Sequence, residues 1–339
     1  MNKHISETAR RRAPIQWKNY YMVFLLAALC VIFSMASPQF LTVNNWSNLL
    51  ITQVTTGTMA LGAISVLILG EFDVSLGYMI SFCMMLGAVL SERGLPGPAV
   101  MLAMVGAGAF FGLMSGLFTV KMNISSFIAT LGVGILLFGL NLAISNGEVH
   151  SSGIPKMLLT LGQGKLFKVG YCVWVLIALC LLMHFFLNHT TLGRGLYAVG
   201  GSEKVAFLAG LSTGRIRILA FVLAGAFTGL AAVFQLGQAG AANPSSGPNL
   251  LMPTYAIVFL GATAFQTGVY NVRGLALAII LLGVGSNGIN LIGAPSWAEF
   301  IYNGGVLVLA IFIAQREIYR TAHGDKRRAA KSPASEASQ

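Results

Sequence analysis

Two carboxylates interrupt an otherwise apolar part of the chain. Glu71 and Asp73 lie in the stretch GEFDVSLG, residues 70–77, with almost uncharged runs on both sides. A carboxylate or hydroxyl just before a helix can accept hydrogen bonds from the free amide groups of its first turn. Asp73 or Ser75 is therefore predicted to cap the helix that follows, which leaves Glu71 for a different contact.

A second group of candidate residues is polar but uncharged. Amide and hydroxyl side chains inside apolar runs either bond to neighbouring helices or line a wet path for a neutral, hydrogen-bonding solute. Two of these asparagines are three residues apart, so they share one face of a helix. The residues predicted to line such a path are Gln53, Thr130, Asn141, Asn287 and Asn290.

The chemistry that is missing narrows the function further. No Asp, Glu or His occurs in residues 97–145 or 215–292, which disfavours an intramembrane enzyme and proton coupling. The stretch GQGKL, residues 162–166, lacks the upstream glycine and the following Ser or Thr of a phosphate-binding loop. The four cysteines have neither metal nor disulfide spacing. We therefore expect no cofactor or metal on this chain, and an energy source would have to come from a partner.

The composition indicates what kind of element positions these residues. Hydrophobic residues make up 56% of the 339 residues and charged residues only 9%, against roughly 25% in soluble proteins. A helix of about 20 apolar residues spans a hydrocarbon core of about 30 Å. The sequence therefore predicts an all-α polytopic membrane protein with about ten transmembrane helices. The predicted spans are residues 20–36, 47–69, 75–92, 97–120, 124–145, 171–188, 215–237, 252–268, 272–292 and 298–314.

The cationic residues predict the orientation of these helices. With ten spans, all but four of the 21 Lys and Arg residues fall on one side, which is expected to be cytoplasmic together with both termini. The four on the other side are Arg93, Lys156, Lys165 and Lys168. Because these charges flank spans, they are expected to meet anionic lipid, and nucleic-acid binding is not expected. The predicted parts are a basic tail at 1–19, a transmembrane domain at 20–316, and a disordered cytoplasmic tail at 317–339.

The longest cytoplasmic connection, residues 190–217, carries the signals of a short helix. Ser202 is a good N-cap, Glu203 complements the first turn, and Gly210 is a natural stop. A segment that only connected two spans would not need these helix start and stop signals. We therefore expect a helix at 203–209 that docks to a cytoplasmic partner. Its predicted coupling residues are Gly200 and Gly201 as hinges, Ser202 and Glu203 at the start, Val205, Ala206 and Leu208 as apolar contacts, and Gly210 at the end.

Four stretches resemble one family in their order along the chain. They are GEFDVSLG, NISSFIATLGVGILLFG (123–139), TTLGRGLYAVGGSEKVAFLAGL (190–211) and SNGINLIG (286–293). They are similar to permease subunits of bacterial ABC importers of the ribose, xylose, arabinose and galactoside type. This resemblance implies a multi-pass protein of the bacterial inner membrane whose path carries a sugar or related neutral solute.

The resemblance also implies partners. They are a cytoplasmic ATPase that uses ATP and magnesium and engages the 190–217 loop, a periplasmic or extracellular solute-binding protein, and a second permease copy, identical or homologous. The alternative from another class is a stand-alone channel or facilitator for small neutral solutes, which would need neither the ATPase nor the binding protein. If the chain forms such an import path, Glu71 is the candidate for a gating contact, one that opens or closes the path.

Two polar breaks occupy similar places in the two halves of the chain. One runs from Gly70 to Gly77 and the other from Gly261 to Gly274, each between two apolar runs. Broken helices in corresponding places are known from transporters built of repeats. We therefore expect a pseudo-repeat of two halves, with both breaks near the path.

Overall fold

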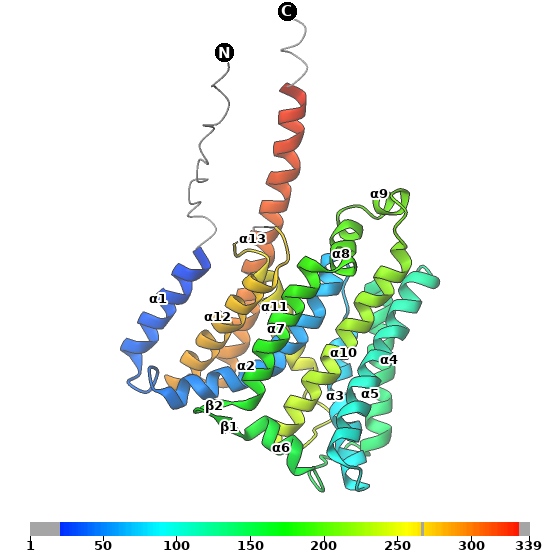
Figure 1. The fold of residues 1–339 in the computed structure, drawn as a ribbon. Coiled ribbons are helices and arrows are strands. Elements are labelled where there is room, and N and C mark those ends of the chain that lie inside the picture. Colours follow the sequence, from blue (N-terminus) through cyan, green and yellow to red (C-terminus); the bar gives the residue numbers. More distant parts are fainter. Residues whose placement is uncertain (1–20, 266–267, 332–339) are drawn as a thin grey trace, which may run out of the picture.

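The computed structural model describes residues 21–265 and 268–331, and it is a bundle of helices with one small hairpin (Figure 1). The elements are α1 (Tyr21–Ala36), α2 (Val43–Ile68), α3 (Ser75–Glu92), α4 (Gly97–Lys121), α5 (Ser126–Ser145), α6 (Lys156–Gln163), β1 (Lys165–Leu166), β2 (Val169–Gly170), α7 (Tyr171–His189), α8 (Thr191–Gly201), α9 (Glu203–Leu208), α10 (Thr213–Ala239), α11 (Pro248–Gly261), α12 (Val272–Leu291) and α13 (Ser296–Lys331).

The ten predicted spans correspond to ten apolar helices in the described part of the chain. Eight are long and apolar enough to cross a membrane: α2, α3, α4, α5, α7, α10, α12 and the first half of α13. The other two, α1 and α11, are shorter apolar helices. The predicted fold class, an all-α polytopic membrane protein, is confirmed.

Close backbone contact holds the centre of the bundle together. Helix α2 is mostly buried and packs against α10, α11, α12 and α7. Helices α4 and α10 approach through glycines, because a Cβ on Gly108 would overlap the Gly225 carbonyl oxygen and a Cβ on Gly112 that of Phe221. Small residues permit such approach where lipid supplies no hydrophobic drive for helix association.

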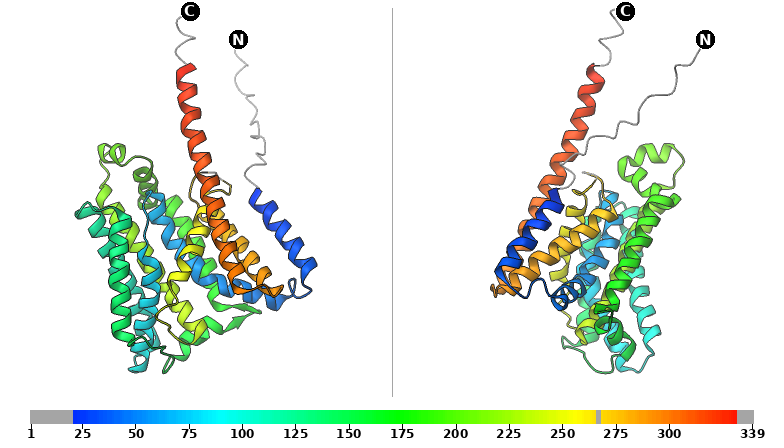
Figure 2. Two further views of the ribbon diagram at one scale, coloured as in Figure 1. Left: turned by 180° about the vertical axis from the view of Figure 1, so that it is seen from behind. Right: turned by 60° about the vertical axis from the view of Figure 1, so that its left-hand side comes forward.

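The two ends of the described chain lie on the same side of the bundle. The start of α1, the end of α13 and the helices α8 and α9 gather at one end, whereas α6 and the β1–β2 hairpin lie at the other (Figures 1 and 2). This arrangement agrees with an even number of crossings. Helix α13 continues to Lys331, so part of the tail expected to be disordered continues a helix, as its Ala, Arg and Lys content favours. The predicted 1–19 tail and residues 332–339 lie outside the described residues.

An irregular segment that the sequence analysis did not predict precedes α11. Residues 240–247 connect α10 to α11. Gly240 ends α10 with a φ of 63°, in the left-handed region that favours glycine. The segment meets the start of α11 beside the second turn of α3. There the Gly247 amide donates to Ser81 Oγ at 2.7 Å, and Asn141 Nδ2 donates to the Pro244 carbonyl at 2.9 Å. Helix α11 is consequently only 14 residues long, and the irregular backbone lies against protein, where its polar groups find partners.

The two predicted breaks both lie at helix ends rather than inside helices. The first is the α2–α3 turn and the second is the α11–α12 connection, and rings link them: Phe72 contacts Phe259, with ring centroids 6.0 Å apart, and Phe259 contacts Tyr270 at 6.3 Å. The two breaks are therefore neighbours in space. The pseudo-repeat itself stays a prediction.

Candidate functional site

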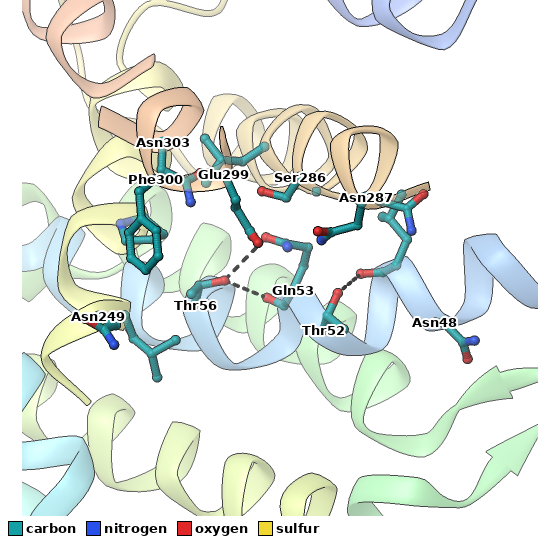
Figure 3. A pocket seen from close by; sticks show the side chains of 16 residues that line it. Asn48, Thr52, Gln53, Thr56, Asn249, Ser286, Asn287, Glu299, Phe300 and Asn303 are labelled. Atoms are coloured by element: carbon teal, nitrogen blue, oxygen red, sulfur yellow. Dashed lines mark hydrogen bonds between the residues drawn. The ribbon is translucent and has the colours of Figure 1, made fainter. Parts of the chain in front are cut away.

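A polar cavity of about 360 Å³ lies among α2, α11, α12 and α13 (Figure 3). Its lining residues are Asn48, Leu49, Thr52, Gln53 and Thr56 on α2, Asn249, Leu250 and Pro253 on α11, Leu282, Gly283, Ser286, Asn287 and Asn290 on α12, and Glu299, Phe300 and Asn303 on α13. The volume falls within the range of roughly 300–1,000 Å³ that is usual for small-molecule sites.

Helical spacing explains why α2 presents polar side chains together. Asn48, Thr52 and Thr56 are four residues apart, so they form one stripe, with Gln53 beside it. A small residue on the facing helix leaves room for them, because a Cβ on Gly283 would lie 2.7 Å from Gln53 Cγ. Gln53 therefore packs closely against α12 at Gly283, and residues of both helices line the cavity beside this contact.

The lining offers hydrogen bonds of both kinds and little charge. Amide side chains donate and accept, and hydroxyls do both. Glu299 carries the only charge among the described lining residues, and Figure 3 shows its side chain pointing from α13 into the cavity. Such a lining suits an uncharged solute with several hydroxyl groups.

Three of the five predicted path residues lie at this cavity: Gln53, Asn287 and Asn290. Asn287 also exchanges two hydrogen bonds with Asn45 of α2, at 2.9 and 3.0 Å, so it joins two helices as well as lining the cavity. The lining residues that the sequence analysis missed include Asn48, Thr52, Asn249 and Asn303. The four-residue spacing of Asn48, Thr52 and Thr56 on α2 could have predicted two of them, Asn48 and Thr52.

The other two predicted path residues lie elsewhere and hydrogen-bond to backbone groups. Thr130 and Asn141 are fully buried and do not line the cavity. Thr130 Oγ1 accepts from the Val74 amide at 3.0 Å, and Asn141 donates to Pro244 as described above. Turns and irregular segments expose amides and carbonyls that cannot stay unpaired in a membrane protein. These two polar side chains pair with such groups.

The α2–α3 turn places the two carboxylates of the opening motif differently. Asp73 Oδ1 accepts from the Ser75 amide at 3.0 Å and from the Ser75 hydroxyl. The N-cap of α3 is neither Asp73 nor Ser75 but Val74, which makes no side-chain capping bond, so Asp73 bonds to the first helical residue from one position before the cap. Complete burial raises the pKa of Asp73 to about 6. Glu71 instead pairs with Arg217 of α10, Oε1 to Nε at 2.6 Å. Burial raises the pKa of Glu71, and Arg217 opposes that rise.

Helix α9 confirms the short helix predicted within residues 190–217. Ser202 Oγ accepts from the Val205 amide, and Gly210 with φ 85° ends the helix, both as predicted. Val205, Phe207 and Leu208 are 64%, 67% and 76% exposed, which leaves an apolar face without a partner within the described chain.

Three details of this region differ from the predictions. Residues 191–201 form a helix, α8, so Gly200 and Gly201 lie in its last turn and are not hinges. Gly200 is instead needed for close packing, because a Cβ there would overlap the Ile68 carbonyl oxygen. Ala206 is only 4% exposed and packs inward, and Phe207, which the sequence analysis did not single out, lies on the exposed face.

From the sequence, Arg217 was counted only among the cationic residues that predict the orientation of the helices. Its Nη1 lies 3.1 Å from Glu203 Oε1, and its Nε bonds to Glu71. It therefore joins the start of α9 to the α2–α3 turn. No local pattern predicts this, since the three residues are far apart in sequence.

Comparison with known proteins gives a consistent family. The family described as the permease component of branched-chain amino acid transport systems matches residues 45–314. The ribose import permease protein RbsC of Escherichia coli K12 is 28% identical over 86% of this chain and 92% of its own length. The L-arabinose ABC transporter permease protein AraH of Azospirillum brasilense is 31% identical over 87% and 86%. The galactose/methyl galactoside import permease protein MglC of Haemophilus influenzae is 28% identical over 87% and 94%.

The family match spans most of the chain and contains nine of the ten apolar helices completely or in large part, from α2 to the first half of α13. The cavity-lining residues all lie within it. The chain belongs to this family of transport-system permease components, and it is a multi-pass membrane protein.

Proposed function

We propose that the chain forms the membrane path of an ATP-driven importer for a monosaccharide or a related neutral polyol. The observation that carries the proposal is the cavity lined by amides and hydroxyls from four helices. A solute with several hydroxyl groups can meet both donors and acceptors there. The names of the relatives, which are permeases for ribose, arabinose and galactosides, favour the same class of cargo.

The energy source in this proposal is a cytoplasmic ATPase, which would bind ATP and magnesium itself. The exposed apolar face of α9, made by Val205, Phe207 and Leu208, is the proposed docking surface. An apolar helix face set into a groove supplies affinity through a few anchors. A secreted solute-binding protein would deliver the cargo at the opposite side. The chain itself would perform no covalent chemistry.

A second permease copy, identical or homologous, is proposed to complete the path. Helix α13 supplies Glu299, Phe300 and Asn303 to the cavity, yet only 6% of the residues in Ser296–Ile313 are buried in the single chain. The other faces of α13 are therefore free to contact a second copy of the permease. Lipid would cover the remainder.

A stand-alone facilitator for small neutral solutes is the alternative. It would share the cavity, but it would have no use for a capped cytoplasmic helix that exposes three large apolar side chains. The ion pairs that tie this helix to the α2–α3 turn also favour the coupled importer.

The cargo class is tested with the solute-binding protein that serves this permease, which is sought among the products of the neighbouring genes. Purified binding protein is titrated calorimetrically with ribose, arabinose, galactose, a polyol and leucine, the last because the family description names branched-chain amino acids. We expect saturable binding of a neutral sugar or polyol and none of leucine. Binding of leucine alone would overturn the sugar assignment and leave the importer assignment standing.

A further inference from the structure

We infer that Arg217 is a positioning residue that links the docking helix α9 to the α11 wall of the cavity through the α2–α3 turn. The inference rests on the proposed function, and it names the residues that pass movement between the ATPase side and the path. Three steps carry it: the ion pairs of Arg217, the hold of the turn on α11, and the place of α11 in the cavity wall.

The first step is the position of Arg217 between two carboxylates. Its Nε bonds to Glu71 Oε1 at 2.6 Å, and its Nη1 approaches both carboxylate oxygens of Glu203, at 3.1 and 3.4 Å. The Arg217 and Glu71 side chains are 22% and 13% exposed, so water screens this pair less than a surface pair. A planar guanidinium is suited to two such contacts at once. The first residue of α9 is thus fixed to the turn.

The second step is the contact between the turn and α11. The hydroxyl of Tyr255 accepts from the Asp73 amide at 2.9 Å and donates to the Asp73 carbonyl at 2.8 Å. The ring of Phe72 lies 5.6 Å from that of Tyr255, between centroids. Both backbone groups of one turn residue therefore bond to a single α11 side chain, so a shift of the turn shifts α11.

The third step is the position of α11 in the cavity wall and its ability to bend. Helix α11 contributes Asn249, Leu250 and Pro253 to the cavity wall. Pro253 lies inside the helix, where it removes a backbone hydrogen bond and provides a point of bending. The irregular segment 240–247 precedes the helix. Tyr255 is two residues from Pro253, so a displacement at Tyr255 acts next to a lining residue and at the point where the helix can bend.

The competing interpretation gives Arg217 a structural or topological role only. Cytoplasmic Arg residues orient membrane helices whether or not they are paired. Arg215, two residues earlier on α10, is exposed and offers the matched control, because its loss removes the same charge from the same helix end. A topological role predicts equal effects of the two substitutions, and the proposed link predicts an effect of Arg217 alone.

The test uses the whole permease reconstituted in lipid nanodiscs with its ATPase and binding protein, and it measures the stimulation of ATP hydrolysis by cargo-loaded binding protein. Arg217→Gln is expected to retain co-purifying ATPase and basal hydrolysis but to lose about tenfold in stimulation, within the usual range of coupling between sites. Arg215→Gln is expected to match the wild type. Tyr255→Phe deletes one hydroxyl and should reproduce the loss, which keeps the test open if Arg217→Gln fails to fold.

A double substitution adds a readout that a general loss of stability would not give. Glu71→Gln combined with Arg217→Gln should be no worse in stimulation than either single change, because both remove one link. Wild-type stimulation in Arg217→Gln and Tyr255→Phe, or an equal loss in Arg215→Gln, would overturn the inference. If no ATPase co-purifies with the wild-type chain, the proposed function fails instead, so the two failures are distinguishable.

Discussion

Asn45 of α2 and Asn287 of α12 exchange a pair of amide hydrogen bonds, each Nδ2 donating to the other's Oδ1 at 2.9 and 3.0 Å. Asn287 also lines the polar cavity, so one side chain both closes the contact between two helices and faces the proposed path. Its neighbour one turn later, Asn290, lines the same cavity and is exposed. The two asparagines therefore separate structural from cargo-binding effects.

Asn290→Leu is expected to reduce cargo uptake severalfold while the protein keeps its abundance in the membrane and its thermal stability, because it removes a cavity donor and acceptor only. Asn287→Leu should reduce uptake and also stability, by about 1–3 kcal/mol, since Asn45 Oδ1 loses its donor while Asn45 Nδ2 keeps only the Phe40 carbonyl. Uptake into vesicles and unfolding of the detergent-purified variants are measured in parallel. Equal stability losses would show that both residues are structural.

Glu299 is predicted to exclude anionic cargo. It carries the only charge among the described residues that line the cavity, and a carboxylate in a confined site repels a second one. Glu299→Gln should leave uptake of a neutral sugar within about twofold and raise uptake of the corresponding uronic acid relative to it. The ratio of the two uptake rates is the measurement. An unchanged ratio would mean that Glu299 lies away from the cargo.

The exposed and buried residues of α9 should respond differently to the same charge. Phe207→Glu places a carboxylate on the exposed apolar face and is expected to weaken co-purification of the ATPase, with the permease still folded. Ala206→Glu forces a charge into a position that is 4% exposed, so it should lower the stability of the permease itself. Thr191→Glu adds the same charge at an exposed position in the first turn of α8, away from this apolar face, and is the control. Retained ATPase binding by Phe207→Glu would exclude this face as the docking surface.

A histidine on the side opposite α9 predicts a pH dependence. His150 Nδ1 lies 2.9 Å from Glu92, and this contact raises the pKa of His150, with Glu148 and the Ser145 carbonyl adding to the rise. A raised pKa in the folded state stabilises the fold fully below the ordinary pKa of about 6.5, and that stabilisation is lost as the pH rises through the folded-state value. The loop carrying His150 bonds to Ala242 through two backbone hydrogen bonds, so it also holds the irregular segment.

The midpoint of thermal unfolding should therefore fall as the pH is raised from about 6 to 8, and Glu92→Gln should flatten that fall. Buried Asp73, whose pKa is raised to about 6, contributes a fall of the same sign. Comparing the variant with the wild type isolates the His150 part, because Asp73 is common to both. If Glu92→Gln left the pH dependence of the unfolding midpoint unchanged, the His150–Glu92 pair would not be a cause of that dependence.

Local rules predicted the features that depend on neighbouring residues. Ser202, Glu203 and Gly210 specify α9 within nine residues, and the apolar runs specify the ten helices. Features that depend on pairing across the fold were not visible. Thr130 and Asn141 are polar residues in spans like those at the cavity, and only the structure shows that they satisfy Val74 and Pro244.

The same limit applies to Arg217 and to residues 240–247. An arginine beside a span is explained by topology alone, so nothing in the sequence pointed to Glu71 and Glu203 as its partners. The irregular segment is polar and rich in small residues, which is typical of an ordinary loop. Its place against Ser81 and Asn141 comes from helices more than a hundred residues earlier.

The polar cavity is proposed to belong to an importer driven by a partner ATPase. The most direct test is uptake of radiolabelled cargo into proteoliposomes that hold the permease, the ATPase and the binding protein, with ATP supplied on the ATPase side. We expect cargo to accumulate above its external concentration, and this accumulation should disappear when ATP, the ATPase or the binding protein is omitted. Uptake by the permease alone that stops at equal concentrations would contradict it and identify a facilitator.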